Sequence, residues 1–474
     1  MPAYDLVIRD VRIVTGKAIK ESDIYVKDGK IARVGLIEPR PQADVVIDGN
    51  GKVALPGLVD THVHFRDPGM VHKEDFESGS KGAAAGGTTT VMDMPTTQPV
   101  VTDAALFREK LQAIAGKALV DYGLYGAAGI ENLHQLEELA KVGAVAFKTY
   151  TVSPPSERLK EYAGALVRSA AELYKVMEKS AAIGLLHCIH AEDDSLVQYL
   201  TTKLKESGRK DAEAHCESRP NLAEELAVHQ AIGIAELTGG KVHLLHISTR
   251  EAVQMIRSAK ARGVKVTAET CPHYLYFTKK DMQKLGPYGK YNPPARSHED
   301  IIALWEGLKD GSIDAIVSDH APHSREEKDA GREDIWKAPP GTPGVETRLP
   351  LVLARAAGWG LDLQDVVRLC ATNPARIYGL GWRKGEITEG MDADIALIDP
   401  NVTWKIDSSE LQTKAKETVI FDQMEVKGQV FCTIVRGRVV YERGVGFEKP
   451  GIGSFLPGQL AESAKKGGDR FLSS

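Results

Sequence analysis

Short runs of alternating apolar and polar residues fill the first 55 positions of the chain, with Gly, Asp or Pro between them. Alternation of this kind predicts half-buried strands, so we expect this segment to form a small antiparallel β unit. The same pattern returns near the C-terminus, at residues 393–398 and 430–440. Two β segments at opposite ends of one chain are most simply explained if they pair, which predicts one small β-sandwich built from both.

The pattern changes between these two segments, where short β-rich runs alternate with helix-like stretches such as 163–179 and 250–262. Strands that alternate with helices indicate parallel βαβ units, and eight of them predict a (β/α)₈ barrel, or TIM barrel. An open doubly wound sheet has the same local pattern, but no Gly-x-Gly-x-x-Gly motif follows a strand here. The eight predicted strands are 58–65, 88–94, 122–127, 144–151, 184–191, 242–248, 264–270 and 315–320.

The predicted fold class is therefore α/β, a barrel with a sandwich formed by the two ends of the chain. The last 30 or so residues are rich in Gly, Lys and Ser, which is typical of a loosely held tail. The predicted segments are 1–55 and 381–445 for the two parts of the sandwich, 56–380 for the barrel and 446–474 for the tail.

Composition excludes several classes of protein. The 60 Lys and Arg against 65 Asp and Glu give a formal net charge of −5, and 42% of the residues are hydrophobic. This balance excludes a disordered chain, and it argues against a nucleic-acid partner, which would require a basic surplus. No run of about 18 apolar residues could span a membrane, and the N-terminus lacks a signal-peptide pattern. The five cysteines are far apart and include no Cys-x-x-Cys pair, so we expect reduced thiols in a cytoplasmic protein.

Residues that can bind a metal ion lie at the C-terminal ends of the predicted barrel strands, where barrels of this kind carry their active sites. Alternate residues of a strand point to one face, and imidazoles that converge with a carboxylate suit Zn²⁺ or a similar divalent ion. The same residue types also occur in ordinary cores, and we leave His187 and His243 with that interpretation. The candidates are His62, His64, Lys148, His190, His246 and Asp319.

Lys148 is the most informative of these residues, because it lies within the apolar run 146–150. Burying a charged lysine costs several kcal/mol unless the ammonium is paired or modified. An ammonium would also repel metal ions bound beside it. A functional Lys148 must therefore be chemically altered or kept away from the metals.

These motifs resemble those of the cyclic amidohydrolases, a family that includes dihydroorotase, allantoinase and hydantoinase/dihydropyrimidinase. The resemblance runs from Pro56 to about Leu380, and residues 56–64 carry the family's His-x-His metal motif. It implies that Lys148 is carboxylated by CO₂ and that the resulting carbamate bridges two zinc ions, or two similar divalent ions. The remaining ligands that match the family are His190, His246 and Asp319.

The resemblance implies hydrolysis of a small cyclic amide. In this mechanism the two ions activate a hydroxide and polarise the scissile carbonyl. Asp319 would bind one ion, accept the proton of the attacking hydroxide and pass it to the departing amide nitrogen. No covalent nucleophile is required, so Ser248 and Cys271 keep structural interpretations.

The residues around this centre resemble dihydroorotase in three places. Arg66 matches the arginine that binds the substrate carboxylate, a role that suits a planar guanidinium. The alternative for Arg66 is a surface ion pair with Asp67 or Asp75. Asn292 matches the asparagine that contacts the dihydroorotate ring, and His323 matches a second carboxylate contact.

Two features depart from dihydroorotase. Thr96 stands where that enzyme has an asparagine that helps to hold the carboxylate, and a threonine hydroxyl is shorter and donates only one hydrogen bond. The stretch 269–274 and the length of 474 residues are closer to allantoinase and hydantoinase.

The balance of these features predicts a dihydroorotase, which interconverts L-dihydroorotate and N-carbamoyl-L-aspartate in pyrimidine biosynthesis. The alternative is an allantoinase or a hydantoinase/dihydropyrimidinase that acts on a related cyclic ureide. A non-catalytic scaffold, known among relatives of the family, is disfavoured because all six ligand-type residues are present. The resemblance also implies a homo-oligomer, either a dimer or a tetramer.

Overall fold

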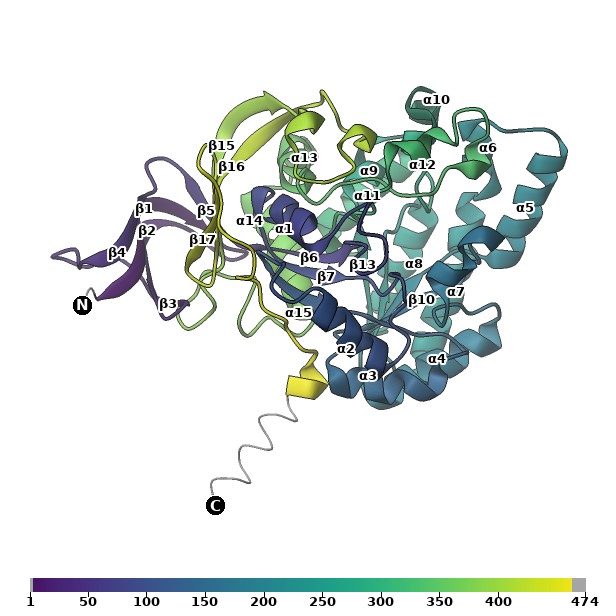
Figure 1. Cartoon of the computed structure of the whole chain (residues 1–474), viewed down its shortest axis with the longest axis horizontal. Coiled ribbons are helices and arrows are strands. Elements are labelled where there is room, and N and C mark those ends of the chain that lie inside the picture. The colour runs from purple at the N-terminus through teal and green to yellow at the C-terminus, as the bar shows by residue number, and fades with distance from the viewer. Residues whose placement is uncertain (1–2, 463–474) are drawn as a thin grey trace, which may run out of the picture.

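The computed structural model describes residues 3–462, and it contains the predicted barrel (Figure 1). Neighbouring barrel strands are parallel and follow one another in chain order. A parallel bridge between Val63 and His320 joins the first strand to the segment after the last one. The third predicted strand is divided at Tyr125 into β8 and β9. The barrel strands are β6 (Leu58–Val63), β7 (Thr88–Asp93), β8 (Asp121–Leu124), β9 (Gly126–Ala127), β10 (Phe147–Tyr150), β11 (His187–His190), β12 (Val242–Leu244), β13 (Val266–Thr270) and β14 (Ala315–Ile316).

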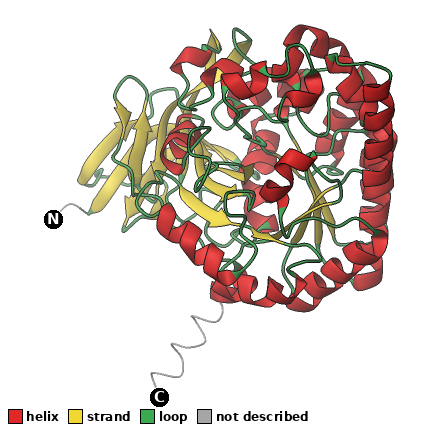
Figure 2. Cartoon of the chain, turned by 45° about the vertical axis from the view of Figure 1, so that its right-hand side comes forward, coloured by secondary structure: helices red, strands yellow, loops and turns green. Residues whose placement is uncertain are grey.

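Helices cover the outside of the barrel strands (Figure 2). Within residues 3–462, no helix is long and apolar enough to cross a membrane. The helices that follow the first five barrel strands are α1 (Phe76–Ala85), α2 (Ala104–Ala113), α3 (Leu136–Val142), α4 (Ala170–Ile183), α5 (Asp194–Glu206), α6 (Ala212–Ser218) and α7 (Asn221–Thr238). The later ones are α8 (Arg250–Ala261), α9 (Pro272–Tyr276), α10 (Met282–Leu285), α11 (His298–Asp310), α12 (Arg325–Asp329), α13 (Arg348–Ala356), α14 (Leu363–Val367) and α15 (Asn373–Ile377).

Helix α4 shows how local interactions set the limits of an element. The sequence predicts a helix over 163–179, whereas α4 begins only at Ala170. Ser169 caps it, because its hydroxyl accepts a hydrogen bond from a backbone N–H of the first turn at 3.2 Å. Leu166, three residues before the cap, pairs with Tyr150 in a parallel bridge and so lies outside the helix.

The two ends of the chain form one nine-stranded sheet, the predicted β-sandwich. Its order is β18-β17-β16-β15-β5-β1-β2-β3, with β4 beside β1. Most of its strands pair antiparallel, as predicted, but β1 pairs in parallel with both β4 and β5. Strand β5 pairs antiparallel with β15 and so joins the two ends of the chain. The strands are β1 (Tyr4–Val14), β2 (Ile19–Lys27), β3 (Lys30–Val34), β4 (Ala43–Asp48), β5 (Val53–Pro56), β15 (Ile395–Lys405), β16 (Glu425–Val435), β17 (Arg438–Glu442) and β18 (Gly446–Phe447).

A buried ion network fastens the sandwich to the barrel. The ammonium of Lys384 lies 2.8 Å from Asp121 on β8, 3.3 Å from Asp392 and 2.5 Å from Asp394. Arg436, in the turn between β16 and β17, also binds Asp121. Although burial opposes it, the three carboxylates raise the pKa of Lys384. The three aspartates are close enough to resemble a metal site, but each of them is already paired with a lysine or arginine side chain.

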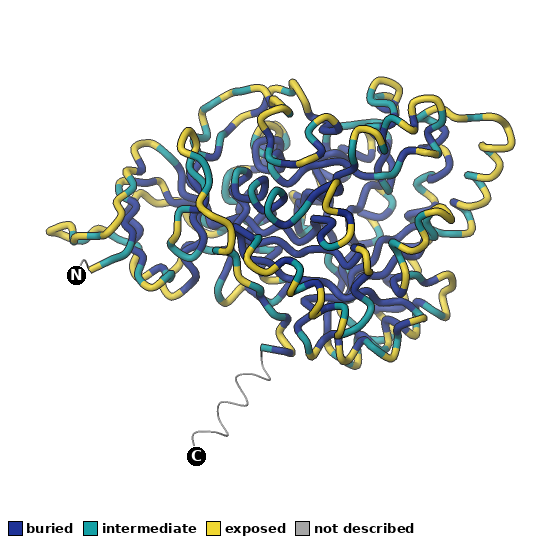
Figure 3. Tube along the Cα trace, viewed as in Figure 1, coloured by how far each residue is buried: buried dark blue, intermediate teal, exposed yellow. Residues whose placement is uncertain are grey.

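The expectation of a loose tail is wrong for residues 446–462. Leu456 is only 1% exposed, and the ring of Phe455 packs against Phe107 with 5.9 Å between centroids. The segment therefore contributes apolar side chains to the core of the barrel, whose interior is largely buried (Figure 3). The rest of the predicted tail, 463–474, lies outside the described residues, and the predicted segment limits remain predictions.

Candidate active site and metal centre

A cavity of about 710 Å³ opens at the C-terminal ends of the barrel strands. Side chains from strands distant in sequence meet here, because parallel strands in a closed barrel all end at one rim. His323 does not line the cavity. The other nine predicted site residues do, and these are His62, His64, Arg66, Thr96, Lys148, His190, His246, Asn292 and Asp319.

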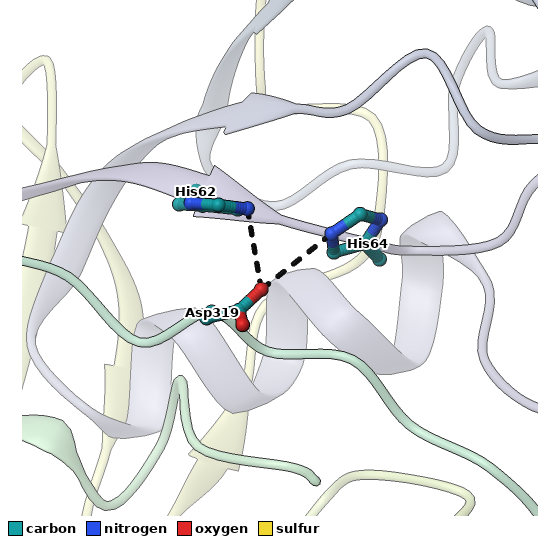
Figure 4. Close-up of side chains that lie close together, drawn as sticks. All are labelled: His62, His64 and Asp319. Carbon is teal, nitrogen blue, oxygen red and sulfur yellow. Dashed lines mark ion pairs between the residues drawn. The ribbon is translucent and has the colours of Figure 1, made fainter. Parts of the chain in front are cut away.

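Two imidazoles and a carboxylate converge at one point of this cavity (Figure 4). One oxygen of Asp319 lies 3.2 Å from Nε2 of His62 and 3.5 Å from Nε2 of His64. The histidines are alternate residues at the end of β6, and the bridge that closes the barrel brings Asp319 beside them. Two nitrogens and one oxygen are donors that a divalent ion such as Zn²⁺ accepts.

A second pair of ring nitrogens lies at the ends of β11 and β12, which are adjacent in the barrel. Nδ1 of His190 faces Nε2 of His246 at 3.0 Å. Burial lowers the pKa of His190 to about 4, although Glu192 opposes this shift, and it lowers the pKa of His246 well below its usual value. Both rings are therefore neutral near pH 7, the form in which imidazole binds metals.

Lys148 lies on β10 with its side chain fully buried. Within residues 3–462, its ammonium nitrogen has no hydrogen-bond partner, and it lies 4.4 Å from the centroid of the Tyr150 ring. Burial lowers the pKa of Lys148 to about 8, a shift that the carboxylate of Asp319 partly opposes. An orphaned, easily deprotonated amine beside two groups of metal ligands fits a carbamate that would serve both groups. The residues present therefore fit a centre with two divalent ions.

Two buried carboxylates hold the histidine rings in place, and the sequence did not assign them. Glu269, at the end of β13, accepts a hydrogen bond from Nδ1 of His62 at 2.6 Å and contacts Nε2 of His243 at 3.0 Å. Glu192 lies 2.7 Å from Nε2 of His190. Carboxylates that bind the second ring nitrogen orient metal-binding histidines and raise their basicity. Both glutamates lie at strand ends, which marks them in the sequence as candidate site residues. That position alone does not distinguish a metal ligand from a residue that orients a metal-binding histidine.

Glu192 also connects the metal ligands to the cavity wall. It forms a buried ion pair with Arg219, whose side chain lines the cavity. Although burial opposes it, Arg219 lowers the pKa of Glu192 to about 2. Glu192 is therefore a carboxylate at neutral pH, as its contact with His190 requires.

Thr96 and His323, two of the predicted substrate residues, contact other residues of the site. The hydroxyl of Thr96 lies 3.0 Å from Nδ1 of His64, so it contacts the histidine ring. His323 is fully buried, and its Nε2 lies 3.3 Å from a terminal nitrogen of Arg66. Burial, followed by the charge of Arg66, lowers the pKa of His323 well below its usual value, so the ring is neutral. Its Nε2 also faces the carbonyl of Pro340 at 3.1 Å, and its Nδ1 faces the ammonium of Lys73 at 3.4 Å. The hydrogen of the neutral ring therefore belongs on Nε2, and His323 contacts Arg66 without accepting a hydrogen bond from it.

Arg66 is only 4% exposed and lines the cavity, which excludes the surface ion pair considered from the sequence. Asp67 pairs with Lys117, and Asp75 pairs with Lys414. The side chain of Arg66 is thus available to the cavity.

Three site residues have a left-handed backbone, with φ of 61° at Arg66, 37° at His246 and 45° at Asp319. They are the only such non-glycine residues between positions 56 and 380 of the described chain. This conformation costs of order 1–3 kcal/mol per residue and is found where the surrounding structure enforces it. The barrel rim therefore holds these side chains in directions that a relaxed backbone would not give.

Comparison with known proteins identifies the family to which the chain belongs. Residues 53–440 match the sequence model of the amidohydrolase family. The chain belongs to the amidohydrolase family. It is similar to the L-hydantoinase of Paenarthrobacter aurescens, with 35% identity over 98% of this chain and all of that protein. A dihydroorotase of Methanosarcina mazei is 37% identical over 96% of this chain and 98% of its own length. An allantoinase of Rubrobacter xylanophilus is 36% identical over 94% of this chain and 96% of its own.

The fold comparison agrees with the sequence comparison. The structure of the L-hydantoinase (dihydropyrimidinase) from Arthrobacter aurescens superimposes with a TM-score of 0.91 at 36% identity, over 96% of this chain and all of that one. The relatives named here are all cyclic amidohydrolases, and this chain is accordingly an amidohydrolase that acts on a cyclic amide. The sequence-based prediction of the family, the fold class and the type of enzyme is confirmed.

Proposed function

We propose that this amidohydrolase opens a ring that carries a carboxylate, and that the substrate is L-dihydroorotate, converted reversibly to N-carbamoyl-L-aspartate. The observation that carries the proposal is the buried guanidinium of Arg66 on the wall of the cavity. Its Nε has no hydrogen-bond partner among residues 3–462, and leaving a buried donor unpaired is costly. A carboxylate on the substrate would satisfy it.

The chain's own residues have distinct tasks in this reaction. His62, His64 and Asp319 would hold one divalent ion, and His190 and His246 the other, with a carboxylated Lys148 shared by both. We propose Zn²⁺ because the donor set is rich in nitrogen. When bound, the ions would supply Lewis acidity for the attack of water on the ring amide.

Asp319 is the residue that would move the proton. Burial raises the pKa of Asp319, although the neighbouring His62 and Lys148 oppose the shift. A carboxylate with a raised pKa accepts a proton more readily than an ordinary aspartate. Asp319 would therefore take the proton from the attacking water and deliver it to the leaving ring nitrogen.

A second candidate is hydrolysis of hydantoin or another neutral cyclic ureide. Thr96 favours it, because Thr96 stands where dihydroorotase has an asparagine that holds the carboxylate. Its hydroxyl contacts His64 and does not replace that amide. The similarity to an L-hydantoinase over the whole of that protein supports it equally.

The expected homo-oligomer and cytoplasmic location remain proposals, and the five free cysteines agree with the latter.

The substrate can be tested with the metal-loaded enzyme and four rings, namely dihydroorotate, dihydrouracil, hydantoin and allantoin. We expect the highest kcat/KM with dihydroorotate. Replacing Arg66 with Gln should lower this value by at least roughly tenfold, the effect of losing one charge-assisted hydrogen bond, and leave dihydrouracil nearly unchanged. A preference of the unaltered enzyme for a neutral ring would reject dihydroorotate and support the second candidate.

A further inference from the structure

A second cavity, called the outer cavity below, has a volume of about 1200 Å³ and shares several lining residues with the catalytic cavity. The boundary between them is formed in part by Arg158 and Glu161, whose side chains line both cavities. Both residues belong to the turn Ser156–Tyr162, which follows β10. Arg158 therefore lies where the two cavities share a wall.

Arg158 is held in a fixed direction by its own loop. Its Nε and Nη2 donate to the two carboxylate oxygens of Glu161 at 3.1 and 2.6 Å, which is the bidentate geometry of a guanidinium and a carboxylate. Its Cζ lies 5.8 Å from the centroid of the Tyr162 ring. Nη1, the remaining nitrogen, is buried and has no hydrogen-bond partner in the described chain.

Arg66 and Arg158 share this unusual condition. Each lines the catalytic cavity, and each carries a buried guanidinium nitrogen without a partner. Glu161 is the ion-pair partner of Arg158, whereas no ion pair to Arg66 occurs within residues 3–462. One more negative charge at this wall would satisfy both arginines.

We infer that Arg66 and Arg158 form a two-arginine site for the carboxylate of the substrate. This inference rests on the proposed function, and it adds a residue that determines specificity for a charged ring over a neutral one. Arg158 would supply the second hydrogen-bond donor that Thr96 does not, because the hydroxyl of Thr96 contacts His64. Glu161 would support Arg158, and His323 lies against Arg66.

The test compares dihydroorotate with dihydrouracil, the same ring without the carboxylate. We would measure kcat and KM for the metal-loaded unaltered enzyme and for Arg158→Gln, Arg158→Lys and Arg66→Gln. Arg168→Gln is the matched control, since Arg168 is an exposed arginine just before α4 that lines neither cavity. Metal content and thermal unfolding of each variant would be compared with the unaltered protein.

We expect Arg158→Gln to lower kcat/KM for dihydroorotate by roughly ten- to a hundredfold, mainly through KM, and to leave dihydrouracil within about twofold. Arg158→Lys should recover part of the loss, because it keeps the charge but not the planar donors. Equal losses on both rings would mean that Arg158 is only structural and would overturn the inference. An effect of Arg66→Gln without any effect of Arg158→Gln would overturn it and leave the proposed function standing. A preference of the unaltered enzyme for dihydrouracil would overturn both.

Discussion

At the scale of single residues, the environment of Lys148 decides what the centre can bind. Its amine is fully buried beside two groups of metal ligands, and burial brings its pKa to about 8. A substantial fraction is therefore neutral at physiological pH, and the neutral amine is the form that reacts with CO₂. The carbamate that results is an anion, so the modification would turn a repulsive charge into a ligand.

Replacing Lys148 with Ala should remove this ligand and reduce turnover by at least about a hundredfold, since losing even a group that only orients a ligand costs 10–100-fold. Metal analysis should show fewer metal ions per chain in Lys148→Ala than in the unaltered protein. A short carboxylic acid such as propionate should restore part of the activity, because it can occupy the vacated space as an anion. Lys203→Ala, an exposed lysine on α5, is the control. Full turnover by Lys148→Ala would show that the lysine has no part in the centre.

The metal-ligand candidates could be predicted because histidine, lysine and aspartate are conspicuous at the ends of apolar strands. The residues that hold them could not, because a glutamate at a strand end has the same appearance whether it binds a metal or a histidine. Only the 2.6 Å contact between Glu269 and His62 distinguishes the two. Arg158 lies in a polar loop without periodicity, so nothing in the sequence separated it from a surface arginine.

At the scale of elements, the order of strands and helices could be predicted, whereas their limits and pairings could not. Strand order follows from the repeated alternation of apolar runs with helical spacing. The start of α4 depended on a cap at Ser169 and on a distant pairing of Leu166. The burial of Leu456 depended on an apolar surface that only the assembled barrel offers.

Glu346, just before α13, links element packing to pH. Its carboxylate accepts a hydrogen bond from the backbone N–H of Gln412 at 2.8 Å, and burial raises its pKa to about 8. The folded state therefore binds a proton more tightly than the unfolded state, so the contribution of Glu346 to stability is present below pH 4.5 and is lost as the pH rises towards 8.

Glu346→Gln should remove this dependence while keeping an oxygen that accepts the hydrogen bond. We would measure the free energy of unfolding by urea titration at several pH values. As the pH rises from 5 to 8, we expect the variant to become progressively more stable relative to the unaltered protein. Glu410→Gln, at an exposed position, should show no such trend. A constant difference across this range would contradict the assignment.

At the scale of the whole molecule, the attachment of sandwich to barrel is centred on one buried cation. Lys384 contacts all three of Asp121, Asp392 and Asp394, which come from both parts of the fold. Breaking a buried ion pair by removing one partner costs about 3–5 kcal/mol, because the other charge remains buried.

Lys384→Met keeps the length of the side chain and removes its charge. We expect it to lower the free energy of unfolding by about 3–5 kcal/mol, measured by urea titration of the metal-loaded protein. Lys427→Met, an exposed lysine on β16, should change it by less than about 0.5 kcal/mol. Equal stability of the two variants would show that the network contributes little.

The pairing of β5 (Val53–Pro56) with β15 (Ile395–Lys405) also has a consequence for biosynthesis. About 340 residues separate the two strands, and a ribosome that adds about 5–20 residues per second needs roughly 17 to 70 s to make them. Throughout this time β5 has an unpaired edge, while the barrel strand that follows it has already been made. An unpaired edge is a template for aggregation, so we expect the nascent chain to depend on a chaperone until its last strands emerge.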